Sequence, residues 1–221
     1  IDKFSIAASE KDLKKKRQIA FELLSCVCAF NVSPFYAKDN CWTAIKKDNE
    51  YKTDGEDGKI DGYFIQANKD QITIKVMQSK FTDNVSQNAV ELFFASVKKY
   101  LIQQSNLLPP GYKALKSIID AINEKKEQYP NAKSKFELYL CSGASNDKQK
   151  AFKDCFKNES FSPNVKFKSI DYAKINKCID KIRLDILNEH AKKNTIKLKS
   201  NFLIQNVQAS NVAIAVLSGQ E

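Results

Sequence analysis

The sequence predicts an α/β fold, built on a mixed β-sheet with flanking helices, and three observations support it. Segments with apolar residues at helical spacing alternate along the chain with short, strand-like segments, which is typical of α/β proteins. Two strand-like segments, 60–67 and 71–81, are separated by a short polar turn, which indicates a hairpin. Residues 136–143 are largely apolar and too few for a helix, so they predict a central, buried strand.

The first helix is predicted over 9–31. Its second half carries apolar residues at helical spacing, Ser9 is suited to the N-cap position, and Ser33–Pro34 ends the helix. Residues 40–59 are polar and rich in turn-forming residues, so they predict a loop. The other helices are predicted over 84–104, 112–128, 146–157 and 173–193, and the other strands over 165–172, 196–206 and 212–217.

The composition is that of an ordinary globular protein with a basic surface. Of the 221 residues, 43% are hydrophobic and 28% charged, and the formal net charge is +10. A balance this basic favours polyanions such as nucleic acid as partners. The alternative is that lysine is simply an abundant surface residue here, because Arg17 and Arg183 are the only arginines. No apolar run reaches the roughly 18 to 20 residues that cross a bilayer, and no secretory leader opens the chain, so we expect a cytoplasmic protein without membrane contact.

The cysteines and the chain ends suggest how the protein is organised. The six cysteines include no C-x-x-C pair and His190 is the only histidine, so we expect reduced thiols and no structural zinc site. The chain lacks an initiator Met and ends just after an apolar run, 212–217, so we expect a fragment of a longer protein. Residues 1–194 are predicted to form one domain, and residues 195–221 the truncated start of a following domain.

The predicted hairpin brings polar side chains to its open end. With the turn centred between the two strands, Asp61 faces roughly Met77, and Gln78 and Lys80 lie beside it, toward the first helix. Because side chains alternate along a strand, Gln78 and Lys80 continue a buried row, where unpaired polar groups are costly. A carboxylate and a divalent cation would give them partners. Asp61 and the main-chain carbonyl of Ser79 could ligate the cation, and Lys80 could orient a water or stabilise charge on the phosphate.

These residues resemble a known nuclease signature. Asp61, followed by Gln78-Ser79-Lys80, is similar to the D…(E/Q)-x-K motif of the PD-(D/E)xK superfamily, and in particular to its Mrr-like Gln-x-Lys branch. Residues 52–65 and 77–81 together resemble the N-terminal region of abortive-infection phage-resistance (AIPR) proteins, with their "DG-x-x-D-x-G-I-D" turn and "Q-S-K-Y/F" strand end.

The resemblance implies a restriction-endonuclease-like core and a Mg²⁺- or Mn²⁺-dependent endonuclease that acts in bacterial phage defence. Asp61, Gln78 and Lys80 would be the catalytic residues. Glu22, on the first helix, would complete the metal site with Asp61 and Ser79; the alternative for Glu22 is a solvated position at the edge of an apolar stripe. Gln78 stands where the commoner motif has an acidic residue, so one negative charge is lost and metal binding would depend on Glu22.

The expected partner is nucleic acid, DNA rather than RNA. A homodimer is compatible with a nuclease that cuts both strands, and the C-terminal remainder of a longer chain is a further expected partner. The candidate nucleic-acid-binding residues, for which a solvated helix face is the alternative, are Lys14, Lys15, Lys16 and Arg17. Two other functions stay open: a catalytically silent nucleic-acid-binding or regulatory module of the same fold, and a ligand-sensing α/β domain with a closed apolar pocket.

Overall fold

The structure is a computed structural model that describes residues 10–43, 45–47, 50–52, 59–104, 108, 112–193, 204–207 and 212–215. The chain divides into two compact units, residues 1–179 and 180–221. We predicted a boundary between residues 194 and 195. Helix α6 (Tyr172–Lys193) runs across the division, so its first two turns belong to the first unit.

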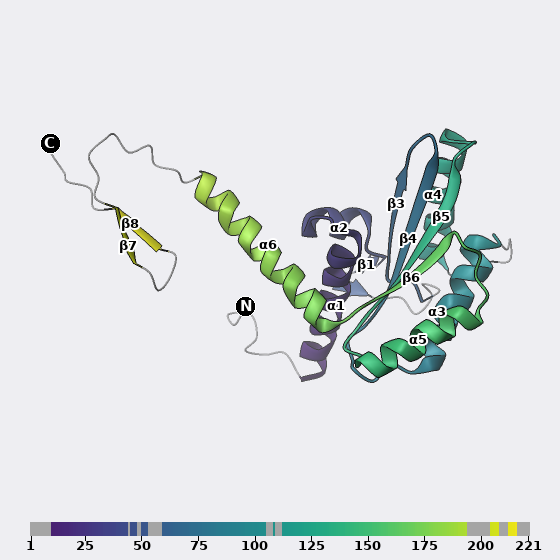
Figure 1. The fold of residues 1–221 in the computed structure, drawn as a ribbon, viewed down its shortest axis with the longest axis horizontal. Coiled ribbons are helices and arrows are strands. Elements are labelled where there is room, and N and C mark those ends of the chain that lie inside the picture. The colour runs from purple at the N-terminus through teal and green to yellow at the C-terminus, as the bar shows by residue number, and fades with distance from the viewer. Residues whose placement is uncertain are drawn as a thin grey trace. The chain divides into compact units, whose positions relative to one another are not determined.

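A four-stranded mixed sheet forms the centre of the first unit (Figure 1). Its strands stand in the order β3-β4-β5-β6, with β3 antiparallel to β4 and the other neighbours parallel. This arrangement confirms the predicted α/β class, the hairpin and the inner position of the strand at 136–143. The strands are β3 (Gly62–Ala67), β4 (Gln71–Lys80), β5 (Lys133–Ser142) and β6 (Val165–Ile170).

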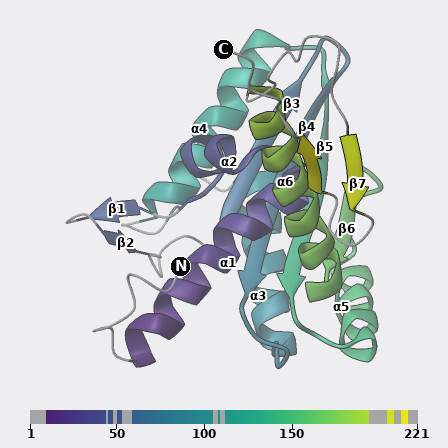
Figure 2. The same ribbon diagram turned by 90° about the vertical axis from the view of Figure 1, so that its left-hand side faces the viewer.

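Helices cover both faces of this sheet (Figure 2). Helix α1 contacts β3, β4 and β5 on one face, where Phe30 stacks on Phe64. On the other face, apolar residues of α3, α4, α5 and the π-helix η2 join Ile74 and Val76 of β4 in the main core. The helices are α1 (Glu10–Phe30), α2 (Pro34–Asn40), α3 (Gln87–Ser96), η2 (Val97–Ile102), α4 (Lys113–Gln128) and α5 (Asn146–Asn158).

The main core rests on closely packed aromatic side chains. Phe93 and Phe94 of α3 are fully buried, and the ring of Phe94 meets that of Phe167 edge-on at a centroid distance of 5.1 Å. Truncating such a side chain to alanine costs about 3–5 kcal/mol. The packing on the α3 face of the sheet therefore contributes much of the stability. A polar side chain buried on this face is unusual, because its surroundings are apolar.

The structure departs from the predicted elements close to the first helix. Residues 34–40 form α2, because Ser33 accepts a hydrogen bond from the Tyr36 N–H as N-cap and Pro34 suits the first turn. Strands β1 (Ile45–Lys47) and β2 (Glu50–Lys52) pair within the segment predicted as a loop. The turn motif at 53–58 lies outside the described residues.

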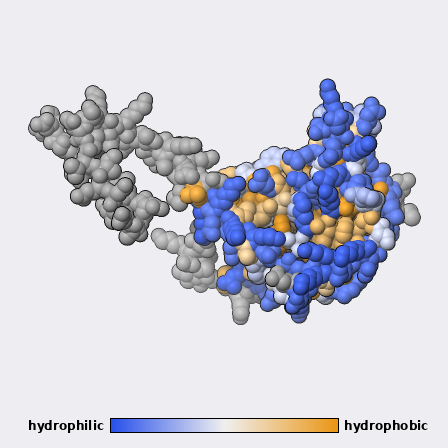
Figure 3. All heavy atoms as spheres, viewed as in Figure 1, coloured by the Kyte–Doolittle hydropathy of each residue, from blue (hydrophilic) through white to orange (hydrophobic). Residues whose placement is uncertain are grey.

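In the second unit, β7 (Ile204–Val207) and β8 (Val212–Ala215) form an antiparallel pair, overlapping two of the predicted strands. All six cysteines of the chain are free. Among the described residues, no single helix is long and apolar enough to cross a membrane; Leu13–Phe30 and Pro34–Asn40 meet that test only as a pair bent by 104°. Figure 3 shows mainly hydrophilic residues on one face of the described part, with smaller hydrophobic patches between them.

Candidate functional site

Asp61 lies just before β3, at an irregularity in the β-ladder. Gly62 pairs with Met77 across the hairpin, yet the N–H of Asp61, one residue earlier, donates to the Met77 carbonyl oxygen at 2.8 Å. Two consecutive residues therefore face one residue of β4, which is the arrangement of a β-bulge. A bulge changes the direction of a side chain, and here the Asp61 carboxylate reaches Ser79.

The Asp61 carboxylate is buried and lacks a cationic partner among the described residues. Ser79 donates to its Oδ2 twice, from the main-chain N–H at 2.6 Å and from the hydroxyl at 3.1 Å. No lysine or arginine of the described residues pairs with it. Glu137, another buried carboxylate on the sheet, instead pairs with Lys135 and Lys168 at 2.7 and 3.1 Å. An uncompensated buried charge is strongly destabilising, so Asp61 would gain more than Glu137 from binding a cation.

Glu22 of α1 lies in the same region as Asp61. It is only 3% exposed, so it is buried rather than solvated, and its Oε2 accepts a hydrogen bond from Trp42 Nε1 at 3.3 Å. Burial is the main reason why the pKa of the Cys26 thiol is raised, and the negative charges of Asp61 and Glu22 add to it. Glu22 lies one helical turn before Cys26 on α1, and Gly62, the neighbour of Asp61, packs against Cys26 Sγ, so both carboxylates lie near Cys26.

Gly62 explains how α1 can approach the hairpin this closely. A Cβ atom at this position would lie 2.5 Å from Cys26 Sγ and 3.2 Å from the carbonyl oxygen of Cys41. Only a residue without a side chain avoids these contacts. The helix and the strand therefore meet at Gly62, and this contact brings Glu22 to the side of the sheet that Asp61 faces.

Gln78 and Lys80 lie on the opposite face of the sheet. Side chains alternate along β4, so Ser79 faces α1 while Gln78 and Lys80 continue the row of Val76 in the main core. This differs from our expectation that all three predicted catalytic residues face the first helix. Gln78 is fully buried, and neither its Oε1 nor its Nε2 has a hydrogen-bond partner among the described residues. Lys80 is half-buried at the last residue of β4 and forms no ion pair with the described residues.

Of the predicted metal ligands, Asp61 and Ser79 are in direct contact and Glu22 lies on the helix that packs against the same side of the sheet, while Gln78 and Lys80 lie on the other face, near the end of β4. In the part of the chain that the structure describes, no three His, Cys, Asp or Glu residues form a group that could hold a metal. Two carboxylates would therefore need neutral oxygen ligands beside them, such as a main-chain carbonyl and water, which Mg²⁺ accepts.

The predicted nucleic-acid-binding residues occupy the first half of α1. All four side chains in the run 14–17 are exposed. Exposure agrees both with contact to a polyanion and with a solvated helix face. These residues lie on α1, the helix that also carries Glu22.

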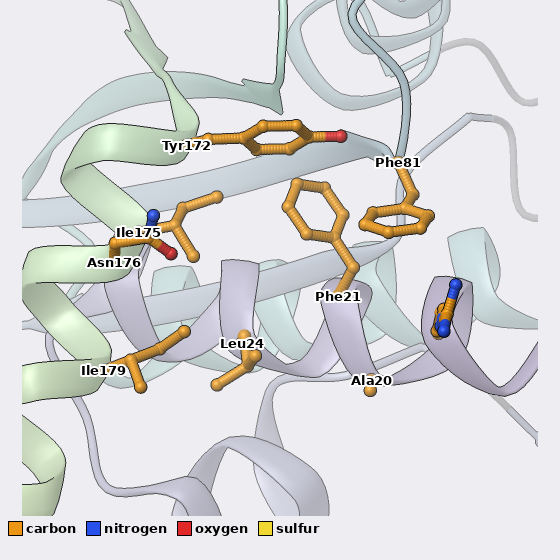
Figure 4. A pocket seen from close by; sticks show the side chains of 9 residues that line it. Ala20, Phe21, Leu24, Phe81, Tyr172, Ile175, Asn176 and Ile179 are labelled. Atoms are coloured by element: carbon orange, nitrogen blue, oxygen red, sulfur yellow. The ribbon is translucent and has the colours of Figure 1, made fainter.

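An apolar pocket lies beside α1, at a position that was not predicted from the sequence (Figure 4). Its lining includes the rings of Phe21, Phe81 and Tyr172. Phe81 directly follows Lys80 and is 43% exposed. The sequence places Phe81 next to the Gln78–Lys80 motif, but it does not indicate which other rings lie beside it.

No protein-family model, curated protein or solved structure matches this chain. The similarity to PD-(D/E)xK nucleases therefore rests on the motif residues alone. The geometry around Asp61 is the independent observation on which a functional proposal can be built.

Proposed function

We propose that the chain is a metal-dependent endonuclease domain that hydrolyses phosphodiester bonds in nucleic acid. The observation that carries this proposal is the buried Asp61 carboxylate, which two neutral donors of Ser79 hold and no cation of the described residues balances. Glu22 adds a second buried carboxylate in the same region. Oxygen ligands of this kind suit hard divalent cations.

The residues present fit Mg²⁺ or Mn²⁺. Asp61, Glu22 and the main-chain carbonyl of Ser79 would hold the cation, which when bound lowers the pKa of a water molecule and polarises a phosphate oxygen. Ser79 orients the carboxylate by donating two hydrogen bonds to Asp61 Oδ2. The other oxygen, Oδ1, accepts no hydrogen bond from the described residues, so it is the atom available as a ligand.

Lys80 and Gln78 act from the other face of the sheet. Lys80 is the last residue of β4, and its flexible four-carbon stem allows the ammonium to reach past the strand end. There it would orient the attacking water or stabilise the charge that develops on the phosphate. Gln78 lies two residues earlier on the same face, and its buried carboxamide is the polar group that the motif resemblance assigns to the site. A site beyond the strand ends can receive side chains from both faces.

The substrate class follows from charge. The chain carries a formal net charge of +10, and the exposed run Lys14–Arg17 lies on the helix that provides Glu22. A positive surface next to a cation site favours a polyanion. DNA as the polymer, a homodimer and a role in phage defence are proposed from the motif resemblance.

A catalytically silent nucleic-acid-binding module is the second candidate. The observation that favours it is the neutral side chain of Gln78 together with the lack of a third acidic ligand among the described residues. A site with fewer charges binds a divalent cation more weakly. Such a module would still bind nucleic acid through the basic run, with the salt dependence that phosphate contacts produce.

A cleavage assay on DNA and RNA with Mg²⁺ or Mn²⁺ distinguishes the two candidates. We expect Asp61→Asn and Lys80→Met each to lower the cleavage rate by roughly 10²–10³-fold, the usual effect of removing one charged group from a transition-state site. Asp120→Asn and Lys116→Met are matched controls. These two residues form an exposed ion pair on α4 at 2.8 Å, and we expect neither to affect the cleavage rate. Salt-sensitive binding without cleavage by the wild type would establish the silent module. Equal cleavage by the wild type and Asp61→Asn would exclude the assigned site.

A further inference from the structure

A pocket of about 320 Å³ lies between α1 and the first turns of α6, beside the end of β4 (Figure 4). All of its lining residues belong to the first unit. Figure 4 shows the rings of Phe21, Phe81 and Tyr172 close together, with aliphatic side chains of α1 and α6 next to them. Because Phe81 follows Lys80 in the chain, the pocket adjoins the proposed cleavage site.

The three rings contact one another and form an aromatic surface. The centroid of Phe21 lies 5.3 Å from that of Phe81 and 5.5 Å from that of Tyr172, and the Tyr172 ring meets Phe21 edge-on at 84°. The Tyr172 ring also covers Gly143, where any Cβ atom would overlap it. Phe21 is buried while Phe81 is 43% exposed, so Phe81 is the ring that remains available to a ligand.

Polar groups in the lining suggest what kind of ligand this is. Arg17 and Asn176 line the pocket together with the rings, and both are exposed. Arg17 ends the basic run that begins at Lys14. A nucleotide has a flat apolar face for an aromatic ring, a polar base edge for a carboxamide and a phosphate for a guanidinium, so its parts match these three groups.

We propose that this pocket binds one unstacked base of a single-stranded nucleic acid. The base lies against Phe81, the carboxamide of Asn176 contacts the base edge, and Arg17 contacts the adjoining phosphate. Bases of an intact duplex are paired and stacked, and they would have to be flipped out at a cost of a few kcal/mol. The inference rests on the proposed function and deepens it, because it makes single strands the preferred substrate.

Binding to single-stranded DNA oligonucleotides that contain 2-aminopurine tests the pocket without requiring catalysis. The titrations use the full chain in EDTA, and base contact is followed by quenching of the 2-aminopurine fluorescence. We expect Phe81→Leu to weaken binding by roughly 5- to 150-fold, the usual effect of losing one base-stacking ring. Phe35→Leu is the matched control, because Phe35 is 81% exposed on α2 and does not line the pocket.

Arg17→Met provides a second variant at an exposed position, so its folding is not at risk. The affinity falls as the salt concentration rises, and we expect Arg17→Met to make the slope of log affinity against log salt less steep by about 0.7. This is the value for one phosphate contact to a single strand. Arg183→Met removes the other arginine and should leave the slope unchanged. Equal binding by the wild type and Phe81→Leu would overturn the proposal. Equal affinity of the wild type for the single strand and for its duplex would also overturn it. The same holds if the 2-aminopurine fluorescence is quenched equally by the wild type and by every pocket variant.

The two proposals can fail separately. If 2-aminopurine binding depends on Phe81 but no polymer is cleaved in Mg²⁺ or Mn²⁺, the pocket assignment stands and the nuclease assignment fails. If cleavage depends on Asp61 while Phe81→Leu cleaves single strands at the wild-type rate and binds them equally well, the pocket assignment fails and the nuclease assignment stands.

Discussion

Replacing Gln78 with methionine should make the protein more stable. Gln78 is fully buried on the main-core face of β4, and within the described part of the chain both polar atoms of its carboxamide lack a hydrogen-bond partner. A buried polar group left unsatisfied costs about 1–3 kcal/mol. Methionine has a similar length and is adaptable in shape, so it fills the same space without this cost. We expect Gln78→Met to raise the free energy of unfolding by about 1–3 kcal/mol, and Tm by about 2–4 °C per kcal/mol.

Gln149 provides the matched control. It is also buried, but its carboxamide donates to the Ala144 carbonyl oxygen at 3.0 Å and accepts from Ser169 Oγ at 2.9 Å. The same substitution there removes two hydrogen bonds and leaves their partners unpaired. We therefore expect Gln149→Met to lower the free energy of unfolding by about 1–3 kcal/mol, so that the two variants shift stability in opposite directions.

Urea unfolding in EDTA measures both variants, with Trp42, the only tryptophan, as the fluorescent probe and circular dichroism as a second signal. A loss of stability in Gln78→Met equal to that in Gln149→Met would refute the reasoning, because it would mean that the Gln78 carboxamide is hydrogen-bonded in the folded protein. We also expect Gln78→Met to cleave more slowly than the wild type, since a buried carboxamide that lowers stability would be retained because cleavage needs it.

Three further predictions follow from the same packing. Burial raises the pKa of Glu137, but hydrogen bonds from Tyr139 and two lysines outweigh it and hold the pKa at about 2, below the usual 4.5. Stability from this group is present above pH 4.5 and lost as the pH falls toward 2, so acid titration of Glu137→Gln should show a flatter decline. Gly62→Ala should lower the free energy of unfolding by about 1–3 kcal/mol, because the new methyl group would overlap Cys26 Sγ. In a urea double-mutant cycle, the same substitution in a Cys26→Ala background should cause a smaller loss. Burial raises the pKa of Cys141 to about 12, so peptide mapping should find this thiol alkylated only after unfolding.

The order of helices and strands could be predicted because apolar spacing records which residues face a core. The hairpin and the inner strand at 136–143 are strong cases, since both carry long apolar rows. Helix α2 was missed because Ser-Pro is a signal both for the end of one helix and for the start of another. The local sequence does not show that Ser33 and Pro34 do both. Strands β1 and β2 are three residues each, too short for a recognisable alternation.

The candidate site shows where sequence reasoning stops. The hairpin pairing brings Asp61 close to Ser79, and this follows from counting residues across the turn. The face on which each side chain lies does not follow, because a bulge adds one residue and changes the alternation beyond it. Gln78 was expected beside Asp61 for this reason. The pocket could not be predicted, because Phe21 and Tyr172 come from segments that only the folded chain brings together.

Binding of Mn²⁺ tests the central claim most directly, because the account depends on a cation at Asp61. Titration followed by electron paramagnetic resonance should detect one Mn²⁺ per chain in the wild type, and Asp61→Asn should weaken this binding at least about tenfold, as loss of one charged ligand implies. Glu137→Gln is the control, since that carboxylate already has lysine partners and should leave Mn²⁺ affinity unchanged. Equal Mn²⁺ affinity in the wild type and Asp61→Asn would contradict the account.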